Sequence, residues 1–207
     1  MLNEKEQRSL DVKDRILSAS RELFIKNGYN GTSVRDIAAA SDTNVAHIKY
    51  YFSSKYKLFE IIFEEAFDVL LSRIKSILKK EGSFFDLIKE WVYTYYDVLE
   101  EYPMIPIFLL NEINQNPKCL TDRLLKREPI ELFDQLAERV EQEVEKGTII
   151  ETSPHDLALN VLSLCVYPFM FGPLATRVAG KSKDDYYELL QGHREYVVEF
   201  VIKALKP

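Results

Sequence analysis

The stretch TSVRDIAAASDTNVAHIKYYFSSK, residues 32–55, decides the fold of this chain. Ser33 followed three residues later by Asp36 is a capping box with Asp in place of Glu, so a short helix begins at Thr32 or Ser33 and ends near Ser41. Asn44 is a favoured N-cap for a second helix. Two short helices joined by a tight turn predict a helix-turn-helix.

The apolar spacing stays helical on both sides of this stretch, and only 7 glycines and 8 prolines interrupt it. A helix from about Val12 to Lys26 precedes it, and Gly28 is placed to adopt the left-handed conformation just past that helix. A long helix follows from Lys55 to the break at residues 82–83. We expect an all-α fold of about nine helices, in which the long helix joins a three-helix N-terminal domain to a helical C-terminal domain.

Capping residues and prolines divide the C-terminal domain into further helices. We expect a helix from Ser83 that stops before Pro103, a helix opening at Pro129, a nearly all-apolar helix from Asp156 to about Phe171, and a last helix over residues 184–205. Shorter helical segments should cover residues 103–116 and 118–126. Pro168 should kink or end its helix, and residues 175–183 should form a loose loop. The predicted domains are a flexible N-terminus (1–10), the helix-turn-helix domain (11–56) and the C-terminal domain (57–207).

The charge is distributed unevenly along the chain. The net charge of −6 and the pI of about 5.3 argue, for the chain as a whole, against a nucleic-acid binder. Residues 1–57, however, hold 10 Lys and Arg against 7 Asp and Glu, which leaves 17 against 26 for residues 58–207. A mildly basic domain that carries the helix-turn-helix therefore precedes a strongly acidic one, and double-stranded DNA becomes the expected partner of the first.

Other features exclude several classes of protein. The cysteines, Cys119 and Cys165, show neither CxxC spacing nor a nearby histidine pattern, which argues against a disulfide framework and a structural zinc site. The first ten residues are polar rather than apolar, and no long uncharged apolar window occurs, so we expect no signal peptide and no membrane contact. We expect a cytoplasmic protein without cofactor, metal or catalytic residues.

The helix-turn-helix divides its contacts between phosphates and bases. The first helix should lie across the DNA backbone, where Thr32 and Ser33 hydroxyls and free N–H groups hold a phosphate oxygen. The second helix should enter the major groove. We expect base contacts from its outward residues and phosphate contacts around them, which gives the DNA-binding set Thr32, Ser33, Arg35, Asn44, Ala46, His47, Lys49, Tyr50, Tyr51 and Lys55.

Residues 12–58 resemble the DNA-binding domain of the tetracycline-repressor (TetR) family. The family pattern has I-L-x-A-A-x-x-L-F, then G-Y, then T-T/S-V-x-x-I-A, and finally a segment ending in Y-F-x-S-K-x-x-L. The matching residues are Ile16, Leu17, Leu23, Phe24, Gly28, Tyr29, Thr32, Ser33, Val34, Ile37, Ala38, Tyr51, Phe52, Ser54, Lys55 and Leu58. The sequence departs from the pattern at Asp42, Asn44, His47 and Lys49, so its groove-facing surface is unusual and the resemblance does not give an operator sequence.

The resemblance implies a regulator, most often a repressor, that binds a near-palindromic operator as a homodimer through its last two helices and is released by a small-molecule effector. The aromatic residues of the C-terminal domain could line the effector pocket, although ordinary core packing explains each of them equally well. The expected pocket set is Trp91, Tyr95, Phe108, Asn111, Glu112, Phe133, Tyr167 and Phe169. A buried Asn111 or Glu112 would be the sharper sign, because a buried polar group needs a partner.

Two other functions remain open at this point. The chain could be an all-helical small-molecule carrier or enzyme with a vestigial DNA-binding domain, although no nucleophile, metal or phosphate-loop motif favours it. It could also bind DNA without any effector, with a C-terminal domain that only dimerises. His47 lacks a partner for base catalysis, while His155 and His193 suit a cap region and a helix face better than a metal site. Phe52 is expected in the core.

Overall fold

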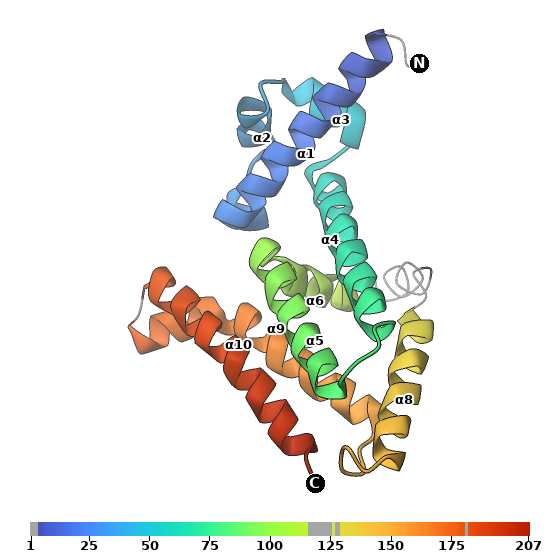
Figure 1. The fold of residues 1–207 in the computed structure, drawn as a ribbon. Coiled ribbons are helices and arrows are strands. Elements are labelled where there is room, and N and C mark those ends of the chain that lie inside the picture. The colour runs from blue at the N-terminus through green and yellow to red at the C-terminus, as the bar shows by residue number, and fades with distance from the viewer. Residues whose placement is uncertain (1–3, 116–125, 127–128, 181) are drawn as a thin grey trace. The chain divides into compact units, whose positions relative to one another are not determined.

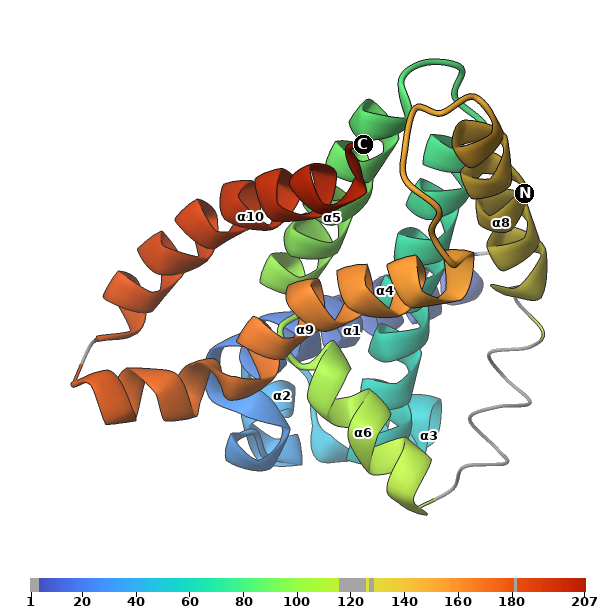
Figure 2. The same cartoon turned by 90° about the horizontal axis from the view of Figure 1, so that it is seen from below.

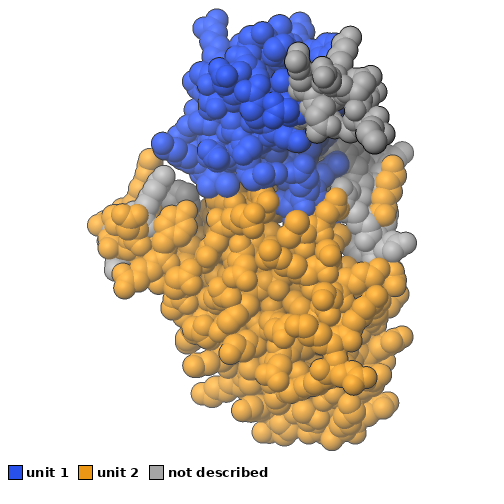
Figure 3. Space-filling model, turned by 45° about the horizontal axis from the view of Figure 1, so that its top comes forward, with its two compact units in different colours: residues 1–67 blue, residues 68–207 orange. Residues whose placement is uncertain are grey.

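The computed structural model describes residues 4–115, 126, 129–180 and 182–207, and all its regular elements are α-helices (Figure 1). The chain divides into two compact units, an N-terminal unit Met1–Phe67 and a C-terminal unit Asp68–Pro207 (Figure 3). Among the described helices, none combines the length and the apolar character that a membrane span requires. The predicted all-α fold is confirmed.

The N-terminal unit contains α1 (Glu4–Gly31), α2 (Val34–Ala40), α3 (Val45–Phe52) and the first turns of α4 (Lys55–Leu78). α1 packs on α2, and α2 on α3. The apolar stripe of each helix meets in one small core, which buries Ile16, Phe24, Ile37, Ile48, Phe52 and Leu58. Phe52 is therefore a core residue, as predicted.

The first helix begins earlier than predicted, at Glu4, so residues 4–10 are helical rather than an irregular N-terminus. Gly28 interrupts the helical conformation near its end with φ 74° and ψ 169°. A positive φ was expected at Gly28. Glycine adopts it readily because it has no Cβ, the group that makes positive φ unfavourable for other residues. After Gly28 the chain forms one more short helical turn, which ends at Gly31 before α2.

The boundary between the compact units lies inside α4, not at the start of that helix as the sequence suggested. The physical reason is burial. Leu58, Phe59, Ile62 and Phe63, on the first turns of α4, are each at most 5 % exposed and belong to the N-terminal unit. The later turns of α4 belong to the C-terminal unit, so this one helix contributes to both.

The C-terminal unit continues with α5 (Phe84–Glu101), α6 (Ile105–Gln115), α8 (Pro129–Glu145), α9 (Pro154–Ala179) and α10 (Lys183–Leu205). α9 is the central helix, because α5, α6, α8 and α10 all pack against it, and α10 also packs on α5 (Figure 2). Ser83 and Ser153 cap α5 and α9, and Pro129 opens α8, as predicted. The expected helical segment 118–126 lies outside the described residues, apart from Lys126.

Pro168 does not end its helix, because α9 runs on to Ala179. A proline removes one backbone donor, but tertiary packing can retain the helix. Cys165 and Phe169, on either side of Pro168, are 0 % and 8 % exposed. From α10, the Tyr186 hydroxyl donates to the Pro168 carbonyl at 2.7 Å. Packing on both sides of the proline therefore overrides its local effect.

The loose loop expected over residues 175–183 is also wrong. Residues 175–179 are the last turn of α9, and Gly180 ends that helix in the left-handed conformation, φ 63° and ψ 26°. Ser182 then caps α10 in a capping box with Asp185. A glycine C-cap and a serine N-cap almost adjacent in sequence make this a tight helix–helix connection. The sequence analysis did not identify Gly180 and Ser182 as caps, because residues 175–183 lack a clear apolar helical pattern.

Candidate nucleic-acid interface

α2 and α3 each begin at an N-cap, Ser33 for α2 and Asn44 for α3. The Ser33 hydroxyl accepts from the Asp36 N–H, while the Asp36 carboxylate accepts from the Ser33 N–H at 2.7 Å. These hydrogen bonds from Ser33 hold the pKa of Asp36 below its usual range. Asp42 adopts φ 50°, and the Asn44 side chain accepts from the His47 N–H. The predicted capping box and Asn44 cap are therefore confirmed, and Asp42 has the positive φ that Asp tolerates better than most residues.

α3 buries one face and exposes the other. Ile48 and Phe52 point into the core at 1 % and 5 % exposure, whereas Tyr50 on the outer face is 80 % exposed. Ala46, His47 and Lys49 are exposed as well. A short helix with this pattern presents a basic and aromatic surface directly after a rigidly capped turn.

Tyr51 lies at the edge of this surface and is half-buried. Its ring meets the Tyr50 ring edge-on, with centroids 5.0 Å apart, and lies 6.3 Å from the His47 ring. The Lys13 ammonium is 5.5 Å from the Tyr51 centroid, which brings a cation from α1 to the same place. Sequence reasoning missed Lys13, because its position on α1 has no counterpart in the motif.

Thr32 has a different position from the one expected. It is 1 % exposed, and its hydroxyl lies 2.9 Å from the Gly28 carbonyl and 3.1 Å from the Leu23 carbonyl, to which it can donate. A hydroxyl turned inward to the last turn of α1 does not reach a phosphate. The structure therefore corrects this expectation: Thr32 joins the end of α1 to the start of α2.

Lys55 is likewise held inside the N-terminal unit. Its ammonium group donates to the Tyr29 carbonyl at 2.8 Å and to the Thr32 carbonyl at 2.9 Å, and lies 4.0 Å from the Tyr29 ring centroid. After the break at Gly28, the Tyr29 carbonyl accepts the Thr32 N–H at 3.4 Å, and Lys55 supplies a closer donor to it. This geometry makes Lys55 a positioning residue, and its expected place in the DNA-binding set stays a prediction.

The remaining predicted DNA-binding residues are on the surface. Ser33 and Arg35 are exposed on the first turn of α2, and Asn44 is exposed where α3 begins. Asp42, in the turn, faces Arg15 of α1 at 3.6 Å, with both side chains open to water. Such an exposed pair adds little stability, but it offsets the negative charge of the turn.

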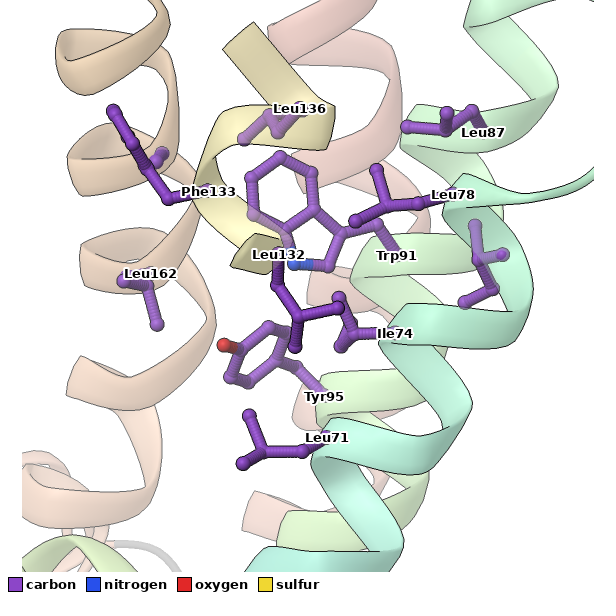
Figure 4. Close-up of a pocket in the computed structure, with 12 residues that line it drawn as sticks. Leu71, Ile74, Leu78, Leu87, Trp91, Tyr95, Leu132, Phe133, Leu136 and Leu162 are labelled. Carbon is purple, nitrogen blue, oxygen red and sulfur yellow. The ribbon is translucent and has the colours of Figure 1, made fainter. Parts of the chain in front are cut away.

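A separate pocket of about 210 Å³ lies within the C-terminal unit, between α4, α5, α8 and α9 (Figure 4). Trp91 and Tyr95 of α5 lie at its centre, and burial raises the pKa of Tyr95 well above its usual range. The described residues that line it are Leu71, Ile74, Ile77, Leu78, Leu87, Trp91, Tyr95, Leu132, Phe133, Leu136, Ala158 and Leu162.

Only part of the expected pocket set lines this cavity. Trp91, Tyr95 and Phe133 do. Phe108 and Phe169 are buried elsewhere in the core, and Phe169 meets Tyr96 edge-on at 5.5 Å. Asn111 and Tyr167 are exposed, which overturns the suggestion of a buried Asn111; the Glu112 side chain lies outside the described residues.

Sequence reasoning missed the aliphatic side of this pocket. Leu71, Ile74 and Leu78 follow one face of α4, and Leu132 and Leu136 follow one face of α8. Their helical spacing was visible in the sequence, but the same spacing is typical of any core helix. Only the tertiary arrangement shows that they surround a space. Among the described residues, no group of three or more His, Cys, Asp or Glu side chains is arranged to hold a metal.

α9 and α10 also expose a broad apolar face. On α9 it comprises Tyr167, Phe171, Leu174 and Val178, which recur at helical spacing and are between 39 % and 80 % exposed. On α10 it comprises Leu189, Tyr196 and Phe200, 47 % to 61 % exposed. We call these seven residues the α9–α10 face. So many large apolar side chains on one face are typical of a protein–protein interface.

Comparison with known proteins supports this architecture. Residues 16–62 match the family model "Bacterial regulatory proteins, tetR family". The probable HTH-type transcriptional regulator YttP of Bacillus subtilis is 44 % identical over 59 residues, 28 % of either chain. The HTH-type transcriptional regulator RutR of Escherichia coli is 24 % identical over 207 residues, covering 98 % of this chain and 95 % of RutR.

Among solved structures, the TetR family transcriptional regulator PfmR from Thermus thermophilus aligns with a TM-score of 0.66 at 21 % identity, over 93 % of this chain and 100 % of PfmR. At that identity the likeness shows the fold alone, and it extends over both compact units. The sequence match covers the capped helix-turn-helix described above. Residues 16–62 are therefore a DNA-binding domain of the tetR family of bacterial regulatory proteins, and the chain as a whole has the fold of a TetR family regulator.

Proposed function

We propose that this chain is a DNA-binding transcriptional regulator whose α3 enters the major groove of a near-palindromic operator. The observation that carries the proposal is the outer face of α3, which exposes His47, Lys49 and Tyr50 directly after the short turn that ends at the Asn44 N-cap. Ala46, His47 and Tyr50 face the base edges in this assignment. A small residue beside two ring side chains suits contact with thymine methyls and base acceptors.

The phosphate contacts come from residues around that face. Ser33 and Arg35 lie at the N-terminus of α2, where N–H groups favour an anion, and Asn44 lies at the N-terminus of α3. Lys49 and the Tyr51 hydroxyl complete the set on α3. Thr32 and Lys55 support this surface from within, by fixing the chain between α1 and α2.

The protein acts as a homodimer through the α9–α10 face. Two copies joined there would bury the aromatic and aliphatic side chains that a single chain leaves open to water. A dimer presents two α3 helices to DNA, and half-sites about 34 Å apart, or a little more, suit two successive major-groove faces. The acidic C-terminal unit keeps the remainder of the protein away from the phosphates.

A small-molecule effector in the pocket releases the protein from its operator, which makes it a repressor. α4 supports this mechanism, since its first turns belong to the core of the N-terminal unit and its last turns line the pocket. A ligand that displaces those last turns would change the separation of the two N-terminal units of a dimer. Distances between spin labels on the two copies, with and without a ligand that releases DNA, test this step, and an unchanged separation rejects it.

Electrophoretic mobility shift on the DNA upstream of the chain's own gene tests the DNA interface. We expect a shift for the natural chain, and a loss of sequence preference for Tyr50→Ala with retention of the fold. Lys79→Ala is the matched control, since Lys79 is exposed beyond the last turn of α4 in the C-terminal unit. An equal effect of the two substitutions would remove α3 from the interface.

A further inference from the structure

The pocket contains a buried hydrogen-bond donor without an acceptor, the indole N–H of Trp91. Trp91 is 6 % exposed, and its indole Nε1 has no hydrogen-bond partner among the described residues. Burial raises the pKa of the neighbouring Tyr95 and the indole opposes that rise, yet no hydrogen bond of normal geometry joins the two groups. A buried donor without an acceptor is costly, so a ligand that supplies the acceptor would be favoured by more than its apolar contacts.

The other side chains that line the pocket carry no charge, so the pocket disfavours an ionised ligand. Of the described side chains that line the pocket, none is Asp, Glu, Lys, Arg or His, and nine of the twelve are Leu, Ile or Ala with a tenth, Phe133, aromatic. Burial keeps the Tyr95 phenol in its neutral form. An ionised ligand would lose its hydration here without meeting an opposite charge, whereas a hydrocarbon surface would be matched on all sides.

We propose that the pocket takes an uncharged, mainly hydrocarbon small molecule with one hydrogen-bond acceptor, such as a ketone or ether oxygen, placed against Trp91 Nε1. This inference rests on the proposed function, because it names the chemical class of the effector of that same pocket. The volume of about 210 Å³ limits the ligand to a small molecule. Figure 4 shows the wall it would contact, with Leu71 and Ile74 of α4, Leu132 and Leu136 of α8, and Leu162 of α9 around the Trp91 and Tyr95 rings.

Trp91 is the single tryptophan of the chain, so its emission reports on the pocket directly. The test titrates the full-length protein with four probes of one shape: tert-butylcyclohexanone, its methylene analogue without the oxygen, the matching carboxylate and the matching ammonium. We expect the ketone and the methylene analogue to shift Trp91 emission at concentrations at least about a hundredfold lower than either ion. Equal binding of the carboxylate or the ammonium, or no change with any probe up to its solubility limit, overturns the inference.

Trp91→Phe tests the acceptor, with calorimetry as the readout because the fluorophore is lost. The affinity for the ketone should fall about tenfold more than the affinity for the methylene analogue. Both probes lose the same ring contacts, and only the ketone loses a hydrogen bond. An equal loss for the two probes rejects the assigned role of Nε1. Ala158→Leu, which fills the pocket, should abolish binding of both, and Ser72→Leu on the exposed face of α4 is its control.

DNA binding by the same preparations, measured without any probe, separates the two levels of the proposal. If the protein shifts its operator but the ions bind as well as the ketone, the ligand class is wrong and the regulator remains. If it binds no duplex, the proposed function itself fails, whatever the probes show.

Discussion

The Lys55 ammonium lies 4.0 Å from the centroid of the Tyr29 ring and donates to the Tyr29 carbonyl at 2.8 Å. Both residues belong to the family pattern, and their position in a DNA-binding motif invites the reading that the lysine reaches phosphate. The structure shows that the same lysine ties the first turn of α4 to the end of α1. A loss of DNA binding in Lys55→Ala would therefore report on folding as much as on contact.

Lys55→Gln should destabilise the N-terminal unit by about 2–3 kcal/mol, because two carbonyls lose a charged donor and the Tyr29 ring loses a cation. Chemical denaturation followed by circular dichroism measures this loss. Lys26→Gln, at an exposed position of α1, is the matched control and should change stability by less than about 0.5 kcal/mol. If the two variants prove equally stable, Lys55 has no positioning role.

Gly172 of α9 lies directly against the Tyr186 ring of α10. A Cβ built there lies 2.5 Å from Tyr186 Cε1, and the Tyr186 hydroxyl is held by the Pro168 carbonyl. Gly172→Ala should therefore destabilise the protein by about 1–3 kcal/mol. In a Tyr186→Leu background the same change should become neutral or stabilise by up to about 1 kcal/mol, the helix preference for Ala. Thermal unfolding of the four proteins measures the coupling, and additive effects would contradict the packing described here.

His193 makes the stability of the C-terminal unit depend on pH. Its Nδ1 lies 2.5 Å from the hydroxyl of Tyr96, which is 0 % exposed, and burial lowers the pKa of His193 below its usual range. As pH falls below about 6.5, the unfolded chain binds a proton that the folded chain does not, so stability should decrease over that window. Denaturant midpoints between pH 7.5 and 5.5 measure the effect. His193→Gln should flatten the dependence; an unchanged slope would assign it to another group.

The α9–α10 face predicts a dimer that one charge can break. Tyr196→Glu or Leu174→Glu places a carboxylate in the centre of this face, and sedimentation should show a shift from dimer to monomer. Tyr187→Glu is the matched control, because Tyr187 is 49 % exposed on α10 but lies outside the face. Dimers that persist in both face variants would place the interface elsewhere.

Much of the N-terminal unit could be predicted from the sequence, because its determinants are local. Ser33, Asp36 and Asn44 specify caps through hydrogen bonds to residues three positions away, and Gly28 and Asp42 specify positive φ at single residues. Such signals can be read from the chain alone.

The remaining features depend on contacts between distant residues. Pro168 stays within a helix because neighbouring side chains are buried and Tyr186 reaches its carbonyl from eighteen residues away. Thr32 and Lys55 turn inward and donate to carbonyls that follow the break at Gly28 or adjoin it. The sequence could not divide the aromatic residues of the C-terminal unit between core and pocket. Trp91 and Phe169 both lie on the apolar side of a helix, but of these two only Trp91 borders the cavity.

The salt dependence of DNA affinity tests the central claim most directly. Fluorescence anisotropy of a labelled duplex from upstream of the gene should show strong binding at low salt, with log K falling linearly as log salt rises. In the dimer, Lys49→Gln should make that slope shallower by about 2, one phosphate contact per copy. The account is contradicted if the natural protein binds no duplex at low salt, or if its affinity is independent of salt.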